Sequence, residues 1–103
     1  MKIGLLGFGV VGRGVYEITE GRDDMQVTKV LCLEDINLPD AESVKDIKLI
    51  VEDAEIDTVV EAMGGLHPAY EFVRAAIENG KNVVTSNKAL VPGVAKNTCR
   101  KYW

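Results

Sequence analysis

The sequence is poor in the residues that usually carry metal or disulfide chemistry. It contains one histidine and two cysteines among 103 residues, and the spacing of Cys32 and Cys99 matches no metal-ligand motif. Cys32 lies in an apolar run, where a reduced cysteine usually behaves as a small buried side chain. We therefore expect no metal site, and we expect the chain to work in a reducing, cytoplasmic setting.

Long hydrophobic runs and clusters of positive charge are also scarce. No run approaches the length of a membrane-spanning helix, and the first residues lack the basic and then apolar pattern of a secretory signal peptide. The formal net charge is −4. These features argue against a membrane or a nucleic acid as a partner, although backbone dipoles can still hold a small anion locally.

The composition itself is that of a folded domain. Hydrophobic residues make up 47% of the chain and charged residues 27%, which suits one core with a soluble surface. A length of 103 residues is short for a complete dinucleotide-binding enzyme. We therefore expect a single domain that is minimal or incomplete.

The spacing of three glycines is the most specific motif. Apolar residues 2–6 precede Gly7, Gly9 and Gly12, which have the G-x-G-x-x-G spacing, and a helical pattern follows over residues 10–19. In a strand–turn–helix of this kind the first glycine permits the tight turn. The second lets a pyrophosphate approach the backbone, and the third lets the helix pack on the strand. The strand and helix around the motif favour this interpretation over a glycine-rich turn without a ligand.

The helix after the glycines has its own pattern. We expect Val11, Val15 and Ile18 to form the stripe that faces the core. Gly14 lies inside this helix, where glycine costs stability, and we expect it to serve close packing.

A second strand is predicted over residues 26–33, and it ends at Glu34 and Asp35. In dinucleotide-binding folds that begin with such a strand–turn–helix, an acidic residue at the end of the second strand accepts hydrogen bonds from the adenosine ribose of NAD, whereas an arginine there favours the extra phosphate of NADP. No lysine or arginine is adjacent in sequence, which favours NAD over NADP. The alternative is that these are two exposed acids without a ligand.

Further strands and helices alternate along the chain. We expect helical turns at 41–45, a strand or an apolar patch at 48–51, a buried strand at 56–63, a helix that ends at 79–80 and a strand at 82–85. Strands that alternate with helices predict a Rossmann-like, doubly wound parallel sheet of the α/β class. Ligands of such sheets bind beyond the carboxyl ends of the strands, which here are residues 7–12, 34–35, 63–65 and 85–88.

Three sequence blocks resemble the homoserine dehydrogenase family. They are residues 4–15 (GLLGFGVVGRGV), 56–69 (IDTVVEAMGGLHPA) and 83–90 (VVTSNKAL), in that order. The resemblance implies the NAD(P)-binding domain of an oxidoreductase that interconverts aspartate semialdehyde and homoserine in amino-acid biosynthesis. We place this domain at residues 1–91.

The resemblance also implies which residues contact the cofactor. Lys88 would polarise the substrate aldehyde and is the one candidate catalytic residue. The candidate cofactor-binding residues are Gly7, Phe8, Gly9, Val10, Val11, Gly12, Glu34, Asp35, Met63, Gly64, Gly65, Thr85, Ser86, Asn87 and Lys88. By contrast, we interpret Glu61 as structural or as supporting the site indirectly, and His67 as a residue of a helix start.

The chain departs from the family in two respects. The family has a longer insertion between the first helix and the second strand, often with a basic residue after that strand, whereas residues 21–26 are a short connection here and Glu34 and Asp35 follow the strand, which argues against a preference for NADP. The family also continues beyond the third block into a last strand and a substrate domain that carries its principal catalytic groups, whereas residues 92–103 resemble nothing in it and form a divergent tail. We therefore expect the chain alone to bind NAD or NADP but to be catalytically incomplete. Two other functions stay open, a non-enzymatic nucleotide-binding regulatory module and the nucleotide domain of another amino-acid dehydrogenase such as aspartate dehydrogenase. An uncovered sheet edge could also permit self-association into a homo-oligomer.

Overall fold

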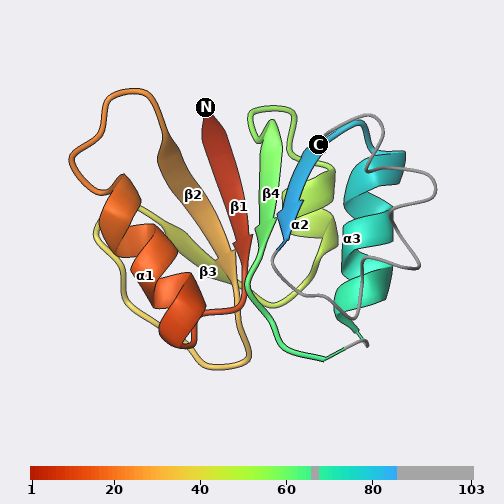
Figure 1. Ribbon diagram of the computed structural model, residues 1–103, viewed down its shortest axis with the longest axis horizontal. Helices are drawn as coiled ribbons and strands as arrows, with labels where there is room; N and C mark the ends of the chain where they lie inside the picture. The colour runs from red at the N-terminus through yellow and green to blue at the C-terminus, as the bar shows by residue number, and fades with distance from the viewer. Residues whose placement is uncertain (66–67, 86–103) are drawn as a thin grey trace.

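A parallel five-stranded sheet organises the residues that the computed structural model describes, 1–65 and 68–85. The strand order is β3-β2-β1-β4-β5 (Figure 1). The strands are β1 (Lys2–Leu6), β2 (Gln26–Leu31), β3 (Glu42–Val44), β4 (Thr58–Glu61) and β5 (Asn82–Thr85), and the helices are α1 (Val10–Thr19), α2 (Lys48–Val51) and α3 (Ala69–Glu78). The expected α/β class and Rossmann-like parallel sheet are thus confirmed.

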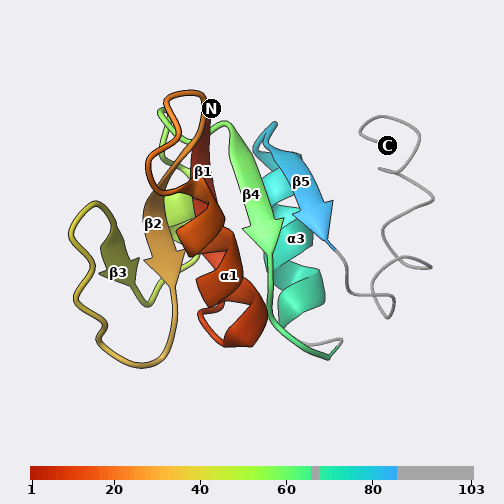
Figure 2. The same cartoon turned by 60° about the vertical axis from the view of Figure 1, so that its left-hand side comes forward.

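The helices cover both faces of the sheet. Helix α1 lies on one face, and α2 and α3 lie on the other (Figures 1 and 2). Because side chains alternate along a strand, β1 sends Ile3 and Leu5 to the α1 face and Leu6 to the opposite face. Each face therefore has its own cluster of buried apolar side chains. Tyr16 of α1 joins one, and Ile50 of α2 and Val73 of α3 join the other.

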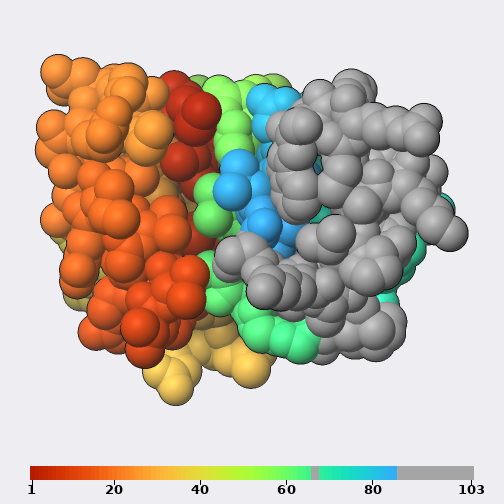
Figure 3. Space-filling view, in the orientation of Figure 1, coloured from red at the N-terminus to blue at the C-terminus, as the bar shows by residue number. Residues whose placement is uncertain are grey.

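The rotation of α1 differs from the expected one. Val11 and Ile18 are 56% and 70% exposed, and only Val15 of the expected stripe packs against the core. The buried residues are instead Gly12, Tyr16 and Thr19. Gly12 fixes this rotation, because a Cβ there would lie 2.2 Å from the carbonyl oxygen of Gly7. The helix therefore turns its glycine towards the sheet, and its outer side forms the orange-red lower left of the surface in Figure 3.

The expectation for residues 41–51 was wrong. Residues 42–44 form strand β3, which pairs in parallel with β2, and residues 48–51 form a helical turn rather than a strand. The Asp46 side chain accepts a hydrogen bond from the backbone N–H of Lys48 at 2.9 Å, which favours a helix start there. Strands β2 and β4 are each shorter than predicted and end at Leu31 and Glu61. The division into residues 1–91 and 92–103 stays a prediction, since residues 86–103 lie outside the described part.

Two glycines of α1 give a matched test of this packing. In Gly12→Ala the new methyl group meets the Gly7 carbonyl, so we expect a loss of about 1–3 kcal/mol in the free energy of unfolding. No atom lies within 4 Å of a Cβ at Gly14, so Gly14→Ala should stabilise by about 0.5–1 kcal/mol through helix propensity. Urea unfolding measures both, and equal effects of the two variants would contradict the packing described for Gly12.

Candidate cofactor site

The carboxyl ends of the strands meet at one edge of the sheet, which is the lower edge in Figure 2. The segments that follow β1, β2 and β4 therefore lie together there, as expected for a parallel sheet. Among the candidate residues, Ser86, Asn87 and Lys88 lie outside the described part of the chain, as does His67.

The glycine loop after β1 has the geometry that its sequence predicts. Gly7 has a φ of +96° and donates a hydrogen bond to the carbonyl oxygen of Leu31 at 2.8 Å, which ties the turn to β2. Gly9 is the N-cap of α1, and apart from its chain neighbours no atom of the described residues lies within 4 Å of a Cβ at this position. Among residues 1–65 and 68–85 no side chain caps the helix, and its first turn carries no acidic residue. A helix start of this kind attracts an anion through its dipole and its donors.

A cavity of about 440 Å³ lies between the glycine loop, the end of β2 and the start of α3. It is lined by four candidate residues, which are Gly7, Phe8, Glu34 and Met63. Leu31, Leu33, Ile36 and Phe72 make much of its remaining wall apolar. An apolar cleft with a few polar groups is typical of a small-molecule site.

Two basic residues that the sequence analysis did not single out also line this cavity, Arg13 and Lys45. The Arg13 guanidinium lies 5.3 Å from the centre of the Phe8 ring, a cation–π distance. The Phe8 ring in turn packs edge-on against Tyr16, with centroids 5.9 Å apart. The aromatic pair therefore holds a positive charge beside the glycine loop, where an anion would bind.

The end of β2 carries charges of both signs. Glu34 is exposed and lines the cavity, while Asp35 forms an ion pair with Lys45 at 2.8 Å. This hydrogen bond from Lys45 lowers the pKa of the Asp35 carboxyl. No lysine or arginine is adjacent to the two acids in sequence, but in the structure Lys45 lies beside Asp35. The lack of a neighbouring basic residue, which favoured NAD over NADP, therefore does not hold in three dimensions. Parallel pairing of β3 with β2 brings Lys45 beside them, and the sequence analysis missed it because β3 was not recognised.

The loop after β4 begins with a hydrogen bond from its backbone to a side chain. The backbone N–H of Met63 donates to Oε2 of Glu61 at 2.7 Å, and the hydroxyl of Thr85 at the end of β5 donates to Oε1 of the same carboxyl group. Gly64 and Gly65 are exposed, and Gly65 has a φ of +78°, which only glycine adopts readily. Met63, Gly64, Gly65 and Thr85 thus lie at the same sheet edge as the glycine loop.

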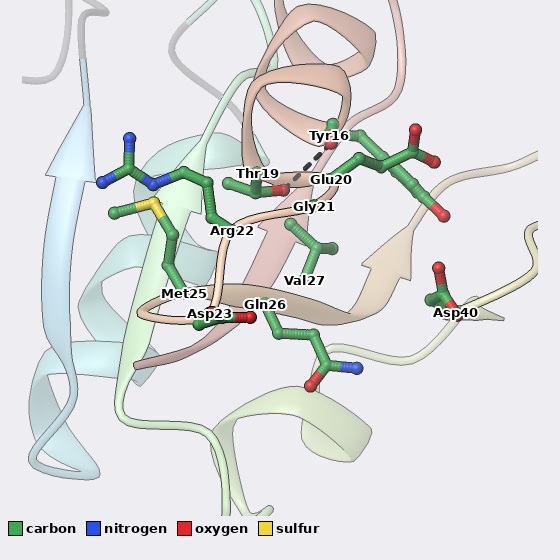
Figure 4. A pocket seen from close by; sticks show the side chains of 10 residues that line it. All are labelled: Tyr16, Thr19, Glu20, Gly21, Arg22, Asp23, Met25, Gln26, Val27 and Asp40. Carbon is green, nitrogen blue, oxygen red and sulfur yellow. Dashed lines mark hydrogen bonds between the residues drawn. The ribbon is translucent and has the colours of Figure 1, made fainter.

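A second cavity of about 310 Å³ lies at the opposite, amino-terminal edge of the sheet (Figure 4). The turn between α1 and β2 forms much of its wall, and Tyr16 and Asp40 face each other across it. Burial raises the pKa of the Tyr16 hydroxyl. Its lining residue Arg22 is already paired with Asp24 at 2.8 Å. Because this cavity has none of the anion-binding features of the glycine loop, the carboxyl edge is the stronger candidate for a cofactor site.

Within residues 1–65 and 68–85 no group of three or more histidine, cysteine or acidic side chains is arranged to hold a metal ion. None of the helices in this part of the chain has the length and apolar character to cross a membrane.

Comparison with known proteins agrees with the geometry of the site. The glycine loop, the parallel sheet and the open helix start define a Rossmann-type dinucleotide-binding domain. A family model described as "Homoserine dehydrogenase, NAD binding domain" matches residues 7–101. The chain belongs to the homoserine dehydrogenase family, and it corresponds to the domain of that family that binds a nicotinamide dinucleotide.

Individual relatives show how much of the family the chain represents. It is 40% identical to homoserine dehydrogenase from a Synechocystis species, over 88% of this chain and 24% of the relative. The Methylobacillus glycogenes enzyme is 39% identical, over 92% of this chain and 26% of the relative. Crystallised homoserine dehydrogenase from S. aureus superposes with a TM-score of 0.78 at 30% identity, over 93% of this chain and 28% of that one. The chain therefore spans about a quarter of the length of these relatives.

Proposed function

We propose that the chain binds NAD, in preference to NADP, along the carboxyl edge of its sheet, as the cofactor-binding part of an enzyme that interconverts homoserine and aspartate semialdehyde. The observation that carries this proposal is the open space at Gly9, at the start of a helix whose first N–H groups have no side-chain cap. That arrangement leaves room for a pyrophosphate against the backbone.

The strand order separates the two halves of the proposed ligand. Val10, Val11 and Gly12 would donate backbone N–H groups to the pyrophosphate, and Arg13 would add a positive charge beside them. The adenosine ribose would lie at the end of β2, and the nicotinamide half at the ends of β4 and β5. These ends lie on opposite sides of β1.

The chemistry of the whole enzyme rests on a hydride that the bound nicotinamide accepts from, or donates to, the substrate. We propose that Lys88 stabilises the negative charge that develops on the aldehyde oxygen during this transfer. Hydride transfer also needs groups that orient the aldehyde, and a domain that spans a quarter of its relatives' length offers few of them.

This proposal predicts that binding and turnover separate in the isolated chain. Calorimetric titration should detect a dinucleotide complex, whereas an assay of NADH formed from homoserine should give no rate above that of a blank. Substrate oxidation by the purified chain would contradict the claim that its catalytic machinery is incomplete.

The role of the glycine loop is tested by Gly9→Val. Since no atom lies within 4 Å of a Cβ at Gly9 and its backbone φ is −84°, we expect the variant to fold. The valine side chain would occupy the space of the pyrophosphate, so affinity for NADH and NADPH should fall at least about tenfold, or roughly 1.4 kcal/mol. Gly14→Ala in the same helix is the matched control and should bind as the unmodified chain does. Undiminished binding by Gly9→Val would overturn the proposed site.

The preference for NAD depends on Glu34. Its carboxylate can accept hydrogen bonds from ribose hydroxyls and would repel an added phosphate, while the charge of Lys45 is offset by Asp35. In Glu34→Ala we expect NADH affinity to fall about tenfold, because a hydrogen bond to a charged group contributes roughly 1.5–3 kcal/mol. NADPH affinity should rise.

The control for this charge change is Glu55→Ala. Glu55 is exposed just before β4, at the opposite edge of the sheet. Calorimetric titration of both variants with NADH and NADPH measures the preference. If the ratio of NADH affinity to NADPH affinity is the same in Glu34→Ala and Glu55→Ala, Glu34 does not contact the ribose.

A further inference from the structure

The carboxyl group of Glu61 is buried at the cofactor edge of the sheet. Glu61 is the last residue of β4 and is 2% exposed. Its Cα pairs with Leu6 of β1 on one side and with Thr85 of β5 on the other, so it lies between two strands. Burying a carboxyl group costs free energy unless hydrogen bonds compensate. A valine here would fit a β-strand core better, and the acid therefore requires an explanation.

Both oxygens of this carboxyl group accept hydrogen bonds, one from the loop after β4 and one from the last residue of β5. Oε2 accepts from the backbone N–H of Met63 at 2.7 Å, and Oε1 accepts from the hydroxyl of Thr85. Side chains of Glu61 and Thr85 share the α3 face, since they lie two residues beyond Val59 and Val83, which pack in the cluster on that face. One side chain thus connects the loop after β4 to the end of β5.

The hydrogen bond to Met63 holds the backbone just beyond the last ladder position of β4. The N–H of Ala62 still continues the sheet by donating to the carbonyl oxygen of Leu6 at 2.9 Å. Met63 is the next residue, its N–H donates to Glu61 instead, and Gly64 and Gly65 follow it. Without the carboxyl group, the Met63 N–H would lose its partner just where the loop reaches the cavity that Met63 lines.

We propose that Glu61 is a positioning residue for the nicotinamide half of the cofactor. It touches neither cofactor nor substrate in this role; it joins Met63, in the loop after β4, to Thr85, the last residue of β5, and so holds together the two strand ends beside which that half would lie. The inference rests on the proposed function. The adenosine half, at β2 on the other side of β1, does not depend on Glu61.

The test compares a ligand that contains the nicotinamide half with one that lacks it. The unmodified chain, Glu61→Leu and Glu61→Gln are titrated with NADH and with ADP-ribose, which lacks the nicotinamide. In Glu61→Leu we expect NADH affinity to fall about tenfold, the effect of roughly 1.4 kcal/mol, while ADP-ribose affinity changes less than about twofold. The shift of dihydronicotinamide fluorescence on binding should shrink in the same variant.

The conservative variant should rescue the effect. A glutamine oxygen can still accept from Met63, and its amide can donate to the Thr85 hydroxyl oxygen, so Glu61→Gln should keep the ratio of the two affinities near that of the unmodified chain. Glu61→Asp keeps the charge but is one methylene shorter, so it cannot reach both partners equally well and should give an intermediate ratio, which tests the inference if Glu61→Leu does not fold. Thr58→Val is the control for destabilisation. It removes a buried hydroxyl at the other end of β4, which bonds to Asp57 at 2.8 Å.

The possible outcomes separate this inference from the proposed function. If the variants weaken NADH and ADP-ribose equally, in step with their unfolding midpoints and with Thr58→Val, Glu61 is structural only and the inference is overturned. If the unmodified chain binds ADP-ribose as tightly as NADH, the nicotinamide half makes no contact for Glu61 to position, and the inference fails while the adenosine site survives. If the unmodified chain binds neither ligand, the proposed function fails and the inference with it.

Discussion

The contact on which the site depends is the close approach of α1 to the turn after β1. At Gly12 a Cβ would lie 2.2 Å from the carbonyl oxygen of Gly7, so the helix can sit this near only with glycine at that position. The contact sets the rotation of α1, which buries Tyr16 and Thr19 and leaves Val11 and Ile18 exposed. It also aims the start of the helix at the carboxyl edge of the sheet. The packing of α1 and the position of the helix start that is proposed to bind an anion are therefore consequences of the same steric constraint.

Around that loop, side chains from distant parts of the sequence complete the edge. Parallel pairing of β3 with β2 brings Lys45 to Asp35, and pairing of β5 with β4 brings Thr85 to Glu61. The Lys45–Asp35 pair offsets charge where the ribose would lie. The Thr85–Glu61 pair joins the ends of β5 and β4, where the nicotinamide would lie. Both arise from the rule that parallel strands present their carboxyl ends at one edge. The sheet thus assembles the site from segments that are each unremarkable alone.

Local patterns predicted much of this arrangement. The G-x-G-x-x-G spacing predicted a turn, an open N-cap and a close contact, and Gly7, Gly9 and Gly12 have these three roles. The burial of α1 was not predictable from apolar spacing, because a steric contact with Gly7 decides it rather than side-chain hydrophobicity. β3 was missed because three residues carry too little periodicity, and Lys45 was missed with it. Glu61 was interpreted as structural or as supporting the site indirectly, and its partners could not be predicted because they depend on strand pairing, which no local pattern encodes.

The most direct test of the account is to follow the backbone amide resonances of the ¹⁵N-labelled chain while NADH is added. We predict that the largest shifts fall on Gly9, Val10, Val11 and Arg13 and that smaller ones fall on Glu34 and Met63. Residues of the cavity at the amino-terminal edge, such as Gly21 and Asp23, should not respond. Shifts centred on that second cavity, or an unchanged glycine loop at saturating NADH, would contradict the claim that the helix start beside Gly9 binds the dinucleotide.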